Sequence, residues 1–145
     1  MSGGVPVGSA APEFAAQTLE GRQLALGEYR GQVVLLDFWA TWCPPCVASL
    51  PHLESLHRRY AADGLRVLGV NQEPDAVEQV RAFVERASLT FPSVFDDRGI
   101  AARYGVTLFP TSVLLDRDLR VLQVYRGPPR AGRLEEDVKR ALFGP

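Results

Sequence analysis

The chain has 145 residues, the usual size of one folded domain, and we expect a single domain spanning residues 1–145. Its 46% hydrophobic and 23% charged residues are ordinary for a soluble globular protein. A net charge of −1 gives no electrostatic reason to expect nucleic acid as a partner, and no apolar run approaches the roughly 20 residues that span a bilayer.

The first residues are small and uncharged, and we expect residues 1–11 to be flexible. They contain neither a basic segment nor an apolar segment of the kind found in a signal peptide. Either the protein is cytoplasmic, or a native leader is missing from this chain.

The first half of the chain alternates between strand and helix patterns. Residues 13–26 predict a short hairpin with its turn at Glu20-Gly21. Residues 33–39 are apolar except for Asp37, which predicts a central strand covered on both faces. An amphipathic helix is expected over residues 47–62, kinked at Pro51, and the next strand over 65–70. Strands joined by a helix in this way pair in parallel.

The second half of the chain predicts further helices and a hairpin, whose two strands pair in antiparallel fashion. We expect a helix over 75–87, a loop or short strand over 91–96, a short helix over 98–104, a hairpin of strands 111–116 and 119–125, and a closing helix that buries Leu134, Val138 and Leu142. The fold class is therefore α/β, with a central mixed sheet flanked by helices and an N-terminal β-hairpin extension.

The chemistry lies in the only two cysteines, Cys43 and Cys46, which follow the central strand and begin the long helix. Positions i and i+3 of a helix are about 5–6 Å apart between Cα atoms, which suits a disulfide. The loop closed by such a bond is too short to stabilise the fold appreciably, so redox chemistry or metal binding must explain the pair. A helix N-terminus also stabilises a thiolate.

Zinc normally requires four ligands. The only histidines, His52 and His57, lie on the same predicted helix as the cysteines and cannot face the two thiols together. We therefore expect no metal site and favour redox chemistry, with a metal-handling dithiol module as the alternative.

Four stretches resemble the thioredoxin superfamily, in particular the TlpA/ResA-like thiol–disulfide oxidoreductases (redoxin or AhpC-TSA-like domains). They are Pro12-Glu-Phe14, Leu36-Asp-Phe-Trp-Ala-Thr-Trp-Cys-Pro-Pro-Cys46, Leu68-Gly-Val-Asn71 and Tyr104-Gly-Val-Thr-Leu-Phe-Pro-Thr111. The resemblance covers about residues 12–143 and implies a thioredoxin-like fold.

The resemblance also implies roles for individual residues. Cys43 would be the exposed nucleophile and Cys46 the resolving thiol. Pro110 matches the cis-proline of the family, which would present the Phe109 backbone to an extended substrate and keep metal ions from the dithiol.

Asp37 interrupts the apolar strand, where burying an unpaired carboxylate costs several kcal/mol. Burial raises the pKa of a carboxyl group, so Asp37 is a candidate proton acceptor for Cys46. It matches the buried acid of thioredoxins. The alternative is a carboxylate held by local hydrogen bonds without a role in proton transfer.

Aromatic and proline residues are expected around the dithiol. Trp42 should cover its rim, whereas Trp39 should lie in the core. Pro44 and Pro45 remove two N–H donors beside the sulfurs and stiffen the turn. With Phe109 and Pro110, residues Trp42, Pro44 and Pro45 form the expected substrate-binding set.

Two further positions bear on the acidity of the site. Many envelope relatives carry Glu three residues after the second cysteine, where this chain has Ser49. Glu73, after the second central strand, either supplies acidity near the thiols or is a solvated loop residue, and we favour the second reading.

The resemblance implies an enzyme that reduces protein disulfides through Cys43 and Cys46, in cytochrome c maturation or general envelope disulfide reduction. It needs no cofactor beyond the dithiol. We expect a monomer with a disulfide-containing protein substrate and an upstream thiol/disulfide electron donor, located in the cell envelope or periplasm, with the cytoplasm as the alternative. A peroxidase-like redoxin is disfavoured because Leu36 stands where the peroxiredoxin pattern Pro-x-x-x-Thr-x-x-Cys has Pro.

Overall fold

The computed structural model describes residues 4–144. Its elements, in chain order, are β1 (Ala15–Gln17), β2 (Gln23–Ala25), η1 (Leu26–Tyr29), β3 (Val33–Trp39), α1 (Pro44–Tyr60), η2 (Ala61–Asp63), β4 (Leu65–Asn71), α2 (Val77–Arg86), β5 (Ser93–Phe95), α3 (Ile100–Arg103), β6 (Thr111–Leu115), β7 (Val121–Arg126) and α4 (Ala131–Phe143). Every predicted helix and strand is present, and the stretch left open at 91–96 contains the short strand β5.

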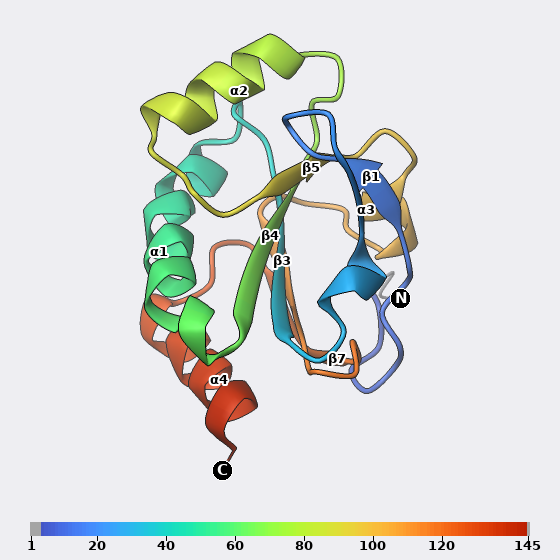
Figure 1. Ribbon diagram of the computed structural model, residues 1–145, viewed down its shortest axis with the longest axis vertical. Helices are drawn as coiled ribbons and strands as arrows, with labels where there is room; N and C mark the ends of the chain where they lie inside the picture. Colours follow the sequence, from blue (N-terminus) through green and yellow to red (C-terminus); the bar gives the residue numbers. More distant parts are fainter. Residues whose placement is uncertain (1–3, 145) are drawn as a thin grey trace.

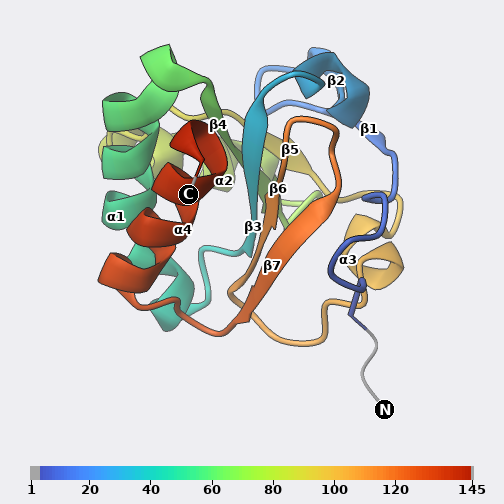
Figure 2. The same cartoon turned by 90° about the horizontal axis from the view of Figure 1, so that it is seen from below.

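A five-stranded mixed sheet organises the molecule, in the order β5-β4-β3-β6-β7. β3 pairs in parallel with β4, and β4 with β5, whereas β6 runs antiparallel to both β3 and β7. The strands β1 and β2 form a separate antiparallel hairpin. Helices α1, α2 and α4 cover one face of the sheet, and α3 and the hairpin lie on the other (Figures 1 and 2). The predicted fold class is confirmed.

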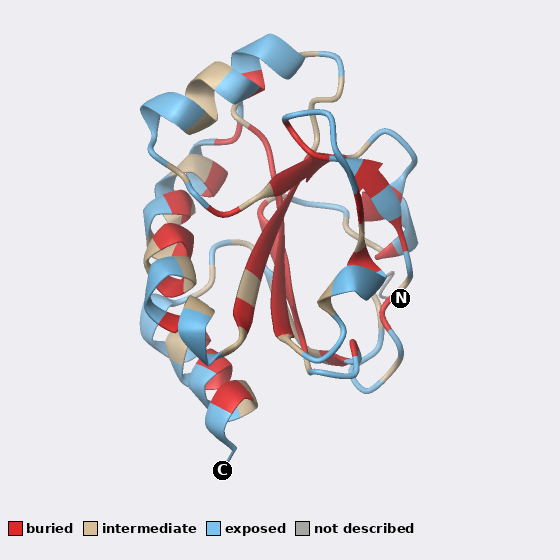
Figure 3. Ribbon diagram, viewed as in Figure 1, coloured by how far each residue is buried: buried red, intermediate tan, exposed pale blue. Residues whose placement is uncertain are grey.

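The core consists of two clusters separated by the sheet, and Figure 3 shows the buried strands at its centre. All seven residues of β3 are buried. Val33, Leu35 and Trp39 belong to the cluster beneath α1 and α4, while Val34, Leu36 and Phe38 belong to the cluster beneath α3. Because side chains alternate along a strand, Asp37 lies on the same face as Trp39, which is the face that also buries both cysteines.

Helix α1 begins at Pro44, before the amphipathic stretch that was expected from residue 47, and the dithiol lies at the start of the helix, as predicted. Proline is well suited to the first turn of a helix because its missing N–H has no intrahelical acceptor there. The helix continues through Pro51 to Tyr60, and the predicted kink stays a prediction. Gly64 follows with a left-handed conformation, φ 105°, and caps η2.

The N-terminal segment contacts the edge of the sheet. The Gly8 N–H donates to the Val121 carbonyl at 2.7 Å, and the Ala11 N–H donates to the Leu119 carbonyl at 2.9 Å. Residues 1–3 of the expected flexible segment lie outside the described residues, and the flexibility of the rest stays a prediction. Within residues 4–144, no helix is both long and apolar enough to cross a membrane.

Candidate active site

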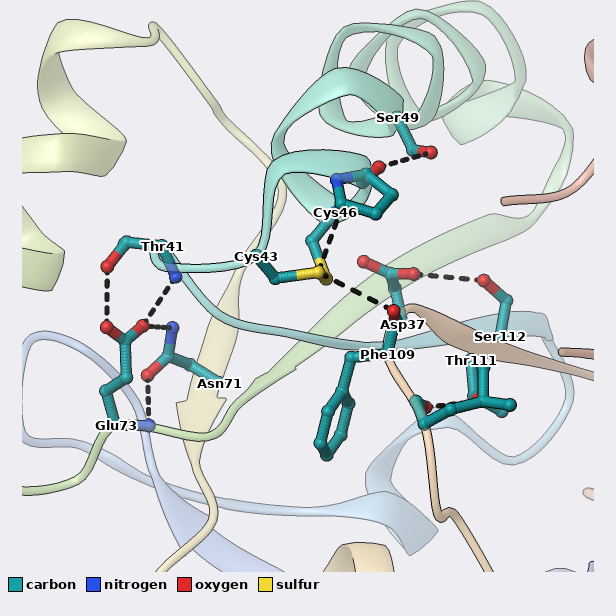
Figure 4. Close-up of a disulfide and its surroundings, with 12 residues drawn as sticks. Asp37, Thr41, Cys43, Cys46, Ser49, Asn71, Glu73, Phe109, Thr111 and Ser112 are labelled. Carbon is teal, nitrogen blue, oxygen red and sulfur yellow. Dashed lines mark hydrogen bonds between the residues drawn. A yellow bond between two sulfur atoms is a disulfide. The ribbon is translucent and has the colours of Figure 1, made fainter. Parts of the chain in front are cut away.

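Cys43 and Cys46 form a disulfide at the start of α1, with their Cα atoms 5.2 Å apart (Figure 4). Cys43 is the N-cap residue, and the Cys46 N–H donates to the Cys43 sulfur at 3.3 Å. A free helix N–H aimed at this sulfur would stabilise a Cys43 thiolate after reduction. The spacing argument for a disulfide is therefore confirmed.

The two cysteines differ in exposure, but less than the family resemblance implied. Cys43 is 4% exposed and Cys46 is 0% exposed. Describing Cys43 as an exposed nucleophile is thus wrong for the oxidised form of the protein. The reason is local packing, since the Cys43 sulfur lies 3.6 Å from the Phe109 carbonyl oxygen and both cysteines belong to the core beneath α1.

The peptide bond between Phe109 and Pro110 is cis, as predicted. Two hydrogen bonds hold this segment: the Thr111 hydroxyl donates to the Leu108 carbonyl at 2.8 Å, and the Gly127 N–H donates to the Pro110 carbonyl at 2.8 Å. The Phe109 carbonyl oxygen lies 3.6 Å from the Cys43 sulfur. The presentation of the Phe109 backbone to a substrate stays a prediction.

Apolar side chains surround the dithiol. Trp42 is 63% exposed and meets Phe109 edge to face, with ring centroids 6.1 Å apart. Pro44 and Pro45 are exposed in the first turn of α1, and Leu108 is exposed on the cis-proline segment. Trp39, by contrast, is fully buried, as predicted. The structure thus gathers the predicted substrate-binding residues at one end of the sheet.

Asp37 is buried in the centre of the sheet, with 1% of its surface exposed. Figure 4 shows that its carboxylate points toward the disulfide. The Ser112 hydroxyl donates a hydrogen bond to Oδ1 at 2.9 Å. Oδ2 has no hydrogen-bond partner among the described residues. Desolvation by burial raises the pKa of Asp37 to about 7, although the hydrogen bond from Ser112 opposes this rise. Asp37 can therefore exchange a proton near neutral pH.

Glu73 is not a solvated loop residue, so the reading that we favoured from the sequence is wrong. Its carboxylate accepts hydrogen bonds from the Thr41 N–H at 2.7 Å, from the Thr41 hydroxyl at 2.5 Å and from the Asn71 side-chain amide at 3.1 Å. Thr41 lies two residues before Cys43, so this carboxylate holds the loop that leads into the dithiol (Figure 4).

Ser49 faces the backbone of its own helix. Its hydroxyl donates to the Pro45 carbonyl at 3.1 Å, and the first turn of α1 has no acidic residue. Position 49 therefore supplies neither the charge nor the proton-accepting group of a carboxylate.

Two residues of the site were not predicted from the sequence. Thr41 and Ser112 are short polar residues in ordinary contexts, and only the strand pairing and the loop contacts reveal their partners. No group of three or more His, Cys, Asp or Glu side chains within residues 4–144 is arranged to hold a metal ion.

The fold and the dithiol define a thioredoxin-like thiol–disulfide oxidoreductase, and comparison with known proteins agrees with this class. Residues 7–124 match the model of the AhpC/TSA family, to which the chain belongs. The chain is 40% identical to the thiol-disulfide oxidoreductase ResA of Geobacillus thermodenitrificans (strain NG80-2) over 140 residues, which cover 95% of this chain and 77% of the relative.

Solved structures support the same class. A crystal structure of a candidate thiol:disulfide interchange protein DsbE from Chlorobium tepidum matches with a TM-score of 0.88 and 35% identity, covering 95% of this chain and 99% of the other. A secreted thiol-disulfide isomerase from Corynebacterium glutamicum matches with a TM-score of 0.79 and 28% identity, covering 92% of this chain and 83% of the other.

Proposed function

We propose that this protein is a dithiol reductant of protein disulfides that acts in the cell envelope. The observation that carries the proposal is the arrangement around one disulfide: Cys43 at the helix N-terminus, the cis Phe109–Pro110 segment against its sulfur, and the buried acid Asp37 on the same face of the sheet. Each of these features has a defined place in thiol–disulfide exchange.

The first step uses Cys43. In the reduced protein its thiolate attacks one sulfur of the client disulfide, so a bond forms between Cys43 and the client while the client's own S–S bond breaks. The second client sulfur leaves as a thiolate. The Cys46 N–H that points at the Cys43 sulfur supports this assignment, because it lowers the free energy of the attacking thiolate.

The second step uses Cys46 and Asp37. Cys46 gives its proton to the Asp37 carboxylate, and its thiolate attacks the Cys43 sulfur. The bond between Cys43 and the client breaks, the client leaves as a second thiolate, and the Cys43–Cys46 disulfide forms. The client has then gained two electrons and the dithiol has lost two, so a thiol/disulfide partner must restore the reduced protein before the next turnover.

The client is recognised along the apolar rim. The Phe109 carbonyl and the exposed side chains of Trp42, Leu108, Pro44 and Pro45 offer an extended polypeptide one backbone contact point and several apolar contacts. None of these side chains is charged, so we propose that client choice depends on an accessible, extended disulfide segment. Immature cytochrome c is one such client, and other envelope disulfide proteins are the alternative.

The envelope location is supported by one structural neighbour that is itself a secreted thiol-disulfide isomerase. An exported protein would meet disulfide-containing clients, which are rare in the cytosol. Fractionation of cells that express the native gene tests the location, because recovery with the cytosolic proteins alone would contradict it.

The activity is tested by following reduction of insulin disulfides with dithiothreitol as the electron donor. We expect acceleration by the unaltered protein and its loss in Cys43→Ser, while Cys46→Ser accumulates a mixed disulfide with the client. Stoichiometric metal binding by the reduced protein without insulin reduction would favour a metal-handling module, and turnover of hydrogen peroxide without insulin reduction would favour a peroxidase.

A further inference from the structure

Asp37 lies on β3, between β4 and β6. Of these two neighbouring strands, β6 donates a hydrogen bond to its carboxylate. On β6 its register partner is Ser112, and on β4 its register partner is Gly69. Directly opposed residues of an antiparallel pair have their Cβ atoms about 4.5–5.5 Å apart, which explains why the Ser112 hydroxyl reaches Oδ1 at 2.9 Å.

The β4 side cannot supply a second partner at this position. A Cβ atom built on Gly69 would overlap the Ser93 hydroxyl and would lie 2.7 Å from the Trp39 indole nitrogen. These two groups are also hydrogen bonded to each other at 3.3 Å, so the space beside Gly69 is occupied by a fixed pair. A side chain at position 69 is thereby excluded, and Ser112 is the donor that the described sheet provides to Asp37.

We propose that Ser112 is a positioning residue for the resolving step: its hydroxyl holds Oδ1 of Asp37 and leaves Oδ2 as the oxygen that accepts the Cys46 proton. This inference rests on the proposed function, because it assigns Ser112 to the proton acceptor of that reaction. It adds a residue that acts through Asp37 and does not touch the client.

The position of Ser112 joins this task to the client-binding segment. Ser112 comes two residues after Pro110, at the beginning of β6. The same short segment therefore places the Phe109 carbonyl against the Cys43 sulfur at one end and orients the proton acceptor at the other. The two ends act on different cysteines of the pair.

Among the described residues, no charged side chain contributes to the altered pKa of Asp37. Among the described residues, burial and the Ser112 hydrogen bond are the two causes of the altered pKa of Asp37. The cysteines are the titratable groups that face it from the direction of α1 (Figure 4), and β4 presents Gly69. Asp137 of α4 is also buried, but it is not among the causes of the altered pKa of Asp37. Its carboxylate accepts a hydrogen bond from the Tyr125 hydroxyl at 2.6 Å and pairs with Arg133 and Arg140.

The test is the Ser112→Ala variant, with the carboxyl carbon of Asp37 followed by NMR in the oxidised protein, where neither cysteine titrates. Loss of a hydrogen bond that favours the carboxylate should raise the pKa of Asp37 by about one to two units. The Ser112→Thr variant keeps a hydroxyl and should restore the original titration. An unchanged Asp37 titration in Ser112→Ala overturns the proposal.

A second experiment measures the rate of the resolving step, in which Cys46 attacks a mixed disulfide on Cys43. After reduction, a disulfide reagent such as dithionitrobenzoate forms a mixed disulfide with Cys43, and release of the second thionitrobenzoate reports attack by Cys46. Release at pH 7 should slow about 5- to 50-fold in Ser112→Ala, the range that a rise of one to two pKa units implies, with its pH profile displaced upward, because less Asp37 is ionised. A raised Asp37 pKa with an unaltered release profile would confirm the hydrogen bond between Ser112 and Asp37 but overturn both Asp37 as the proton acceptor and the role of Ser112 in the resolving step.

The matched control is Ser93→Ala, which also removes a buried hydroxyl from a strand of the same sheet but leaves the Ser112–Asp37 bond in place. Its Asp37 titration should match that of the unaltered protein. If Ser112→Ala fails to fold, the unaltered protein still tests the bond: a slowly exchanging Ser112 hydroxyl proton close to the Asp37 carboxyl carbon supports it, and free exchange with solvent overturns it.

Discussion

Asp37 is tolerated in the core although it has no charged partner among the described residues. Burial favours its neutral form, and one hydroxyl partly offsets that preference. The strand sequence alone predicted a buried carboxyl group with an altered pKa, because a single acid stands in an otherwise apolar run. It could not predict Ser112, whose contact with Asp37 depends on the pairing of two strands that are far apart in the chain.

The raised pKa makes stability depend on pH. The pKa of Asp37 is 3.8 when the chain is unfolded and about 7 when it is folded, so between these values the folded state binds the extra proton. The contribution of Asp37 to the free energy of unfolding is therefore highest below about pH 4 and falls, by on the order of 4 kcal/mol, as the pH rises through 7. Urea unfolding of Asp37→Asn should lose this part of the pH dependence. A parallel pH dependence in the two proteins would contradict the buried, titrating acid.

Asp37→Asn should also slow the reaction. The amide cannot accept a proton, so attack by Cys46 on the mixed disulfide should fall by about 10²-fold or more, the usual contribution of a general base. Alkylation of Cys43 as a function of pH should remain mostly unaltered. Unchanged kinetics of disulfide reduction from pH 6 to 9 would show that Asp37 has no role in proton transfer.

At the scale of elements, the loop before α1 is held by a residue of the loop after β4. Glu73 accepts three hydrogen bonds, two of them from Thr41, and its own N–H donates to the Asn71 side chain at 2.7 Å. The sequence predicted both loops but not this contact. The same is true of Glu54 on α1, which is buried against the Thr90 N–H and hydroxyl, a tertiary contact that helical periodicity cannot predict.

Glu73→Ala removes the acceptor of these three donors. We expect the free energy of unfolding to fall by about 1–3 kcal/mol, because the donors lose a charged acceptor, and alkylation of reduced Cys43 to change in rate. Glu78→Ala is the matched control, since the Glu78 side chain on α2 is 86% exposed, and it should change stability by less than about 0.5 kcal/mol. Equal effects of the two substitutions would show that the loop contact contributes nothing.

At the scale of the whole molecule, the periodicity of the chain was sufficient to predict the class of fold. Apolar runs mark the central strands, amphipathic spacing marks the helices, and the strand–helix–strand order fixes the parallel pairs. Boundaries were less predictable, as at the start of α1, where the first turn contains Pro44 and Pro45 and precedes the amphipathic pattern. The mixed sheet joins both halves of the sequence, which is why we propose a single domain.

A single domain should unfold cooperatively. Trp39 lies in the core and Trp42 at the rim of the dithiol, so each reports on a different part of the molecule. Fluorescence of the Trp39→Phe and Trp42→Phe variants should each give the same urea midpoint as the circular dichroism of the same variant. Midpoints that differ within one variant would indicate parts that unfold separately.

We propose that the dithiol donates electrons to protein disulfides, and this requires a low reduction potential of the Cys43–Cys46 pair. Equilibration of the purified protein with glutathione or dithiothreitol buffers gives this potential from the fraction of oxidised protein. A reductant should have a value close to that of thioredoxin, about −270 mV. A value close to that of DsbA, about −120 mV, would make the protein an oxidant and contradict the claim.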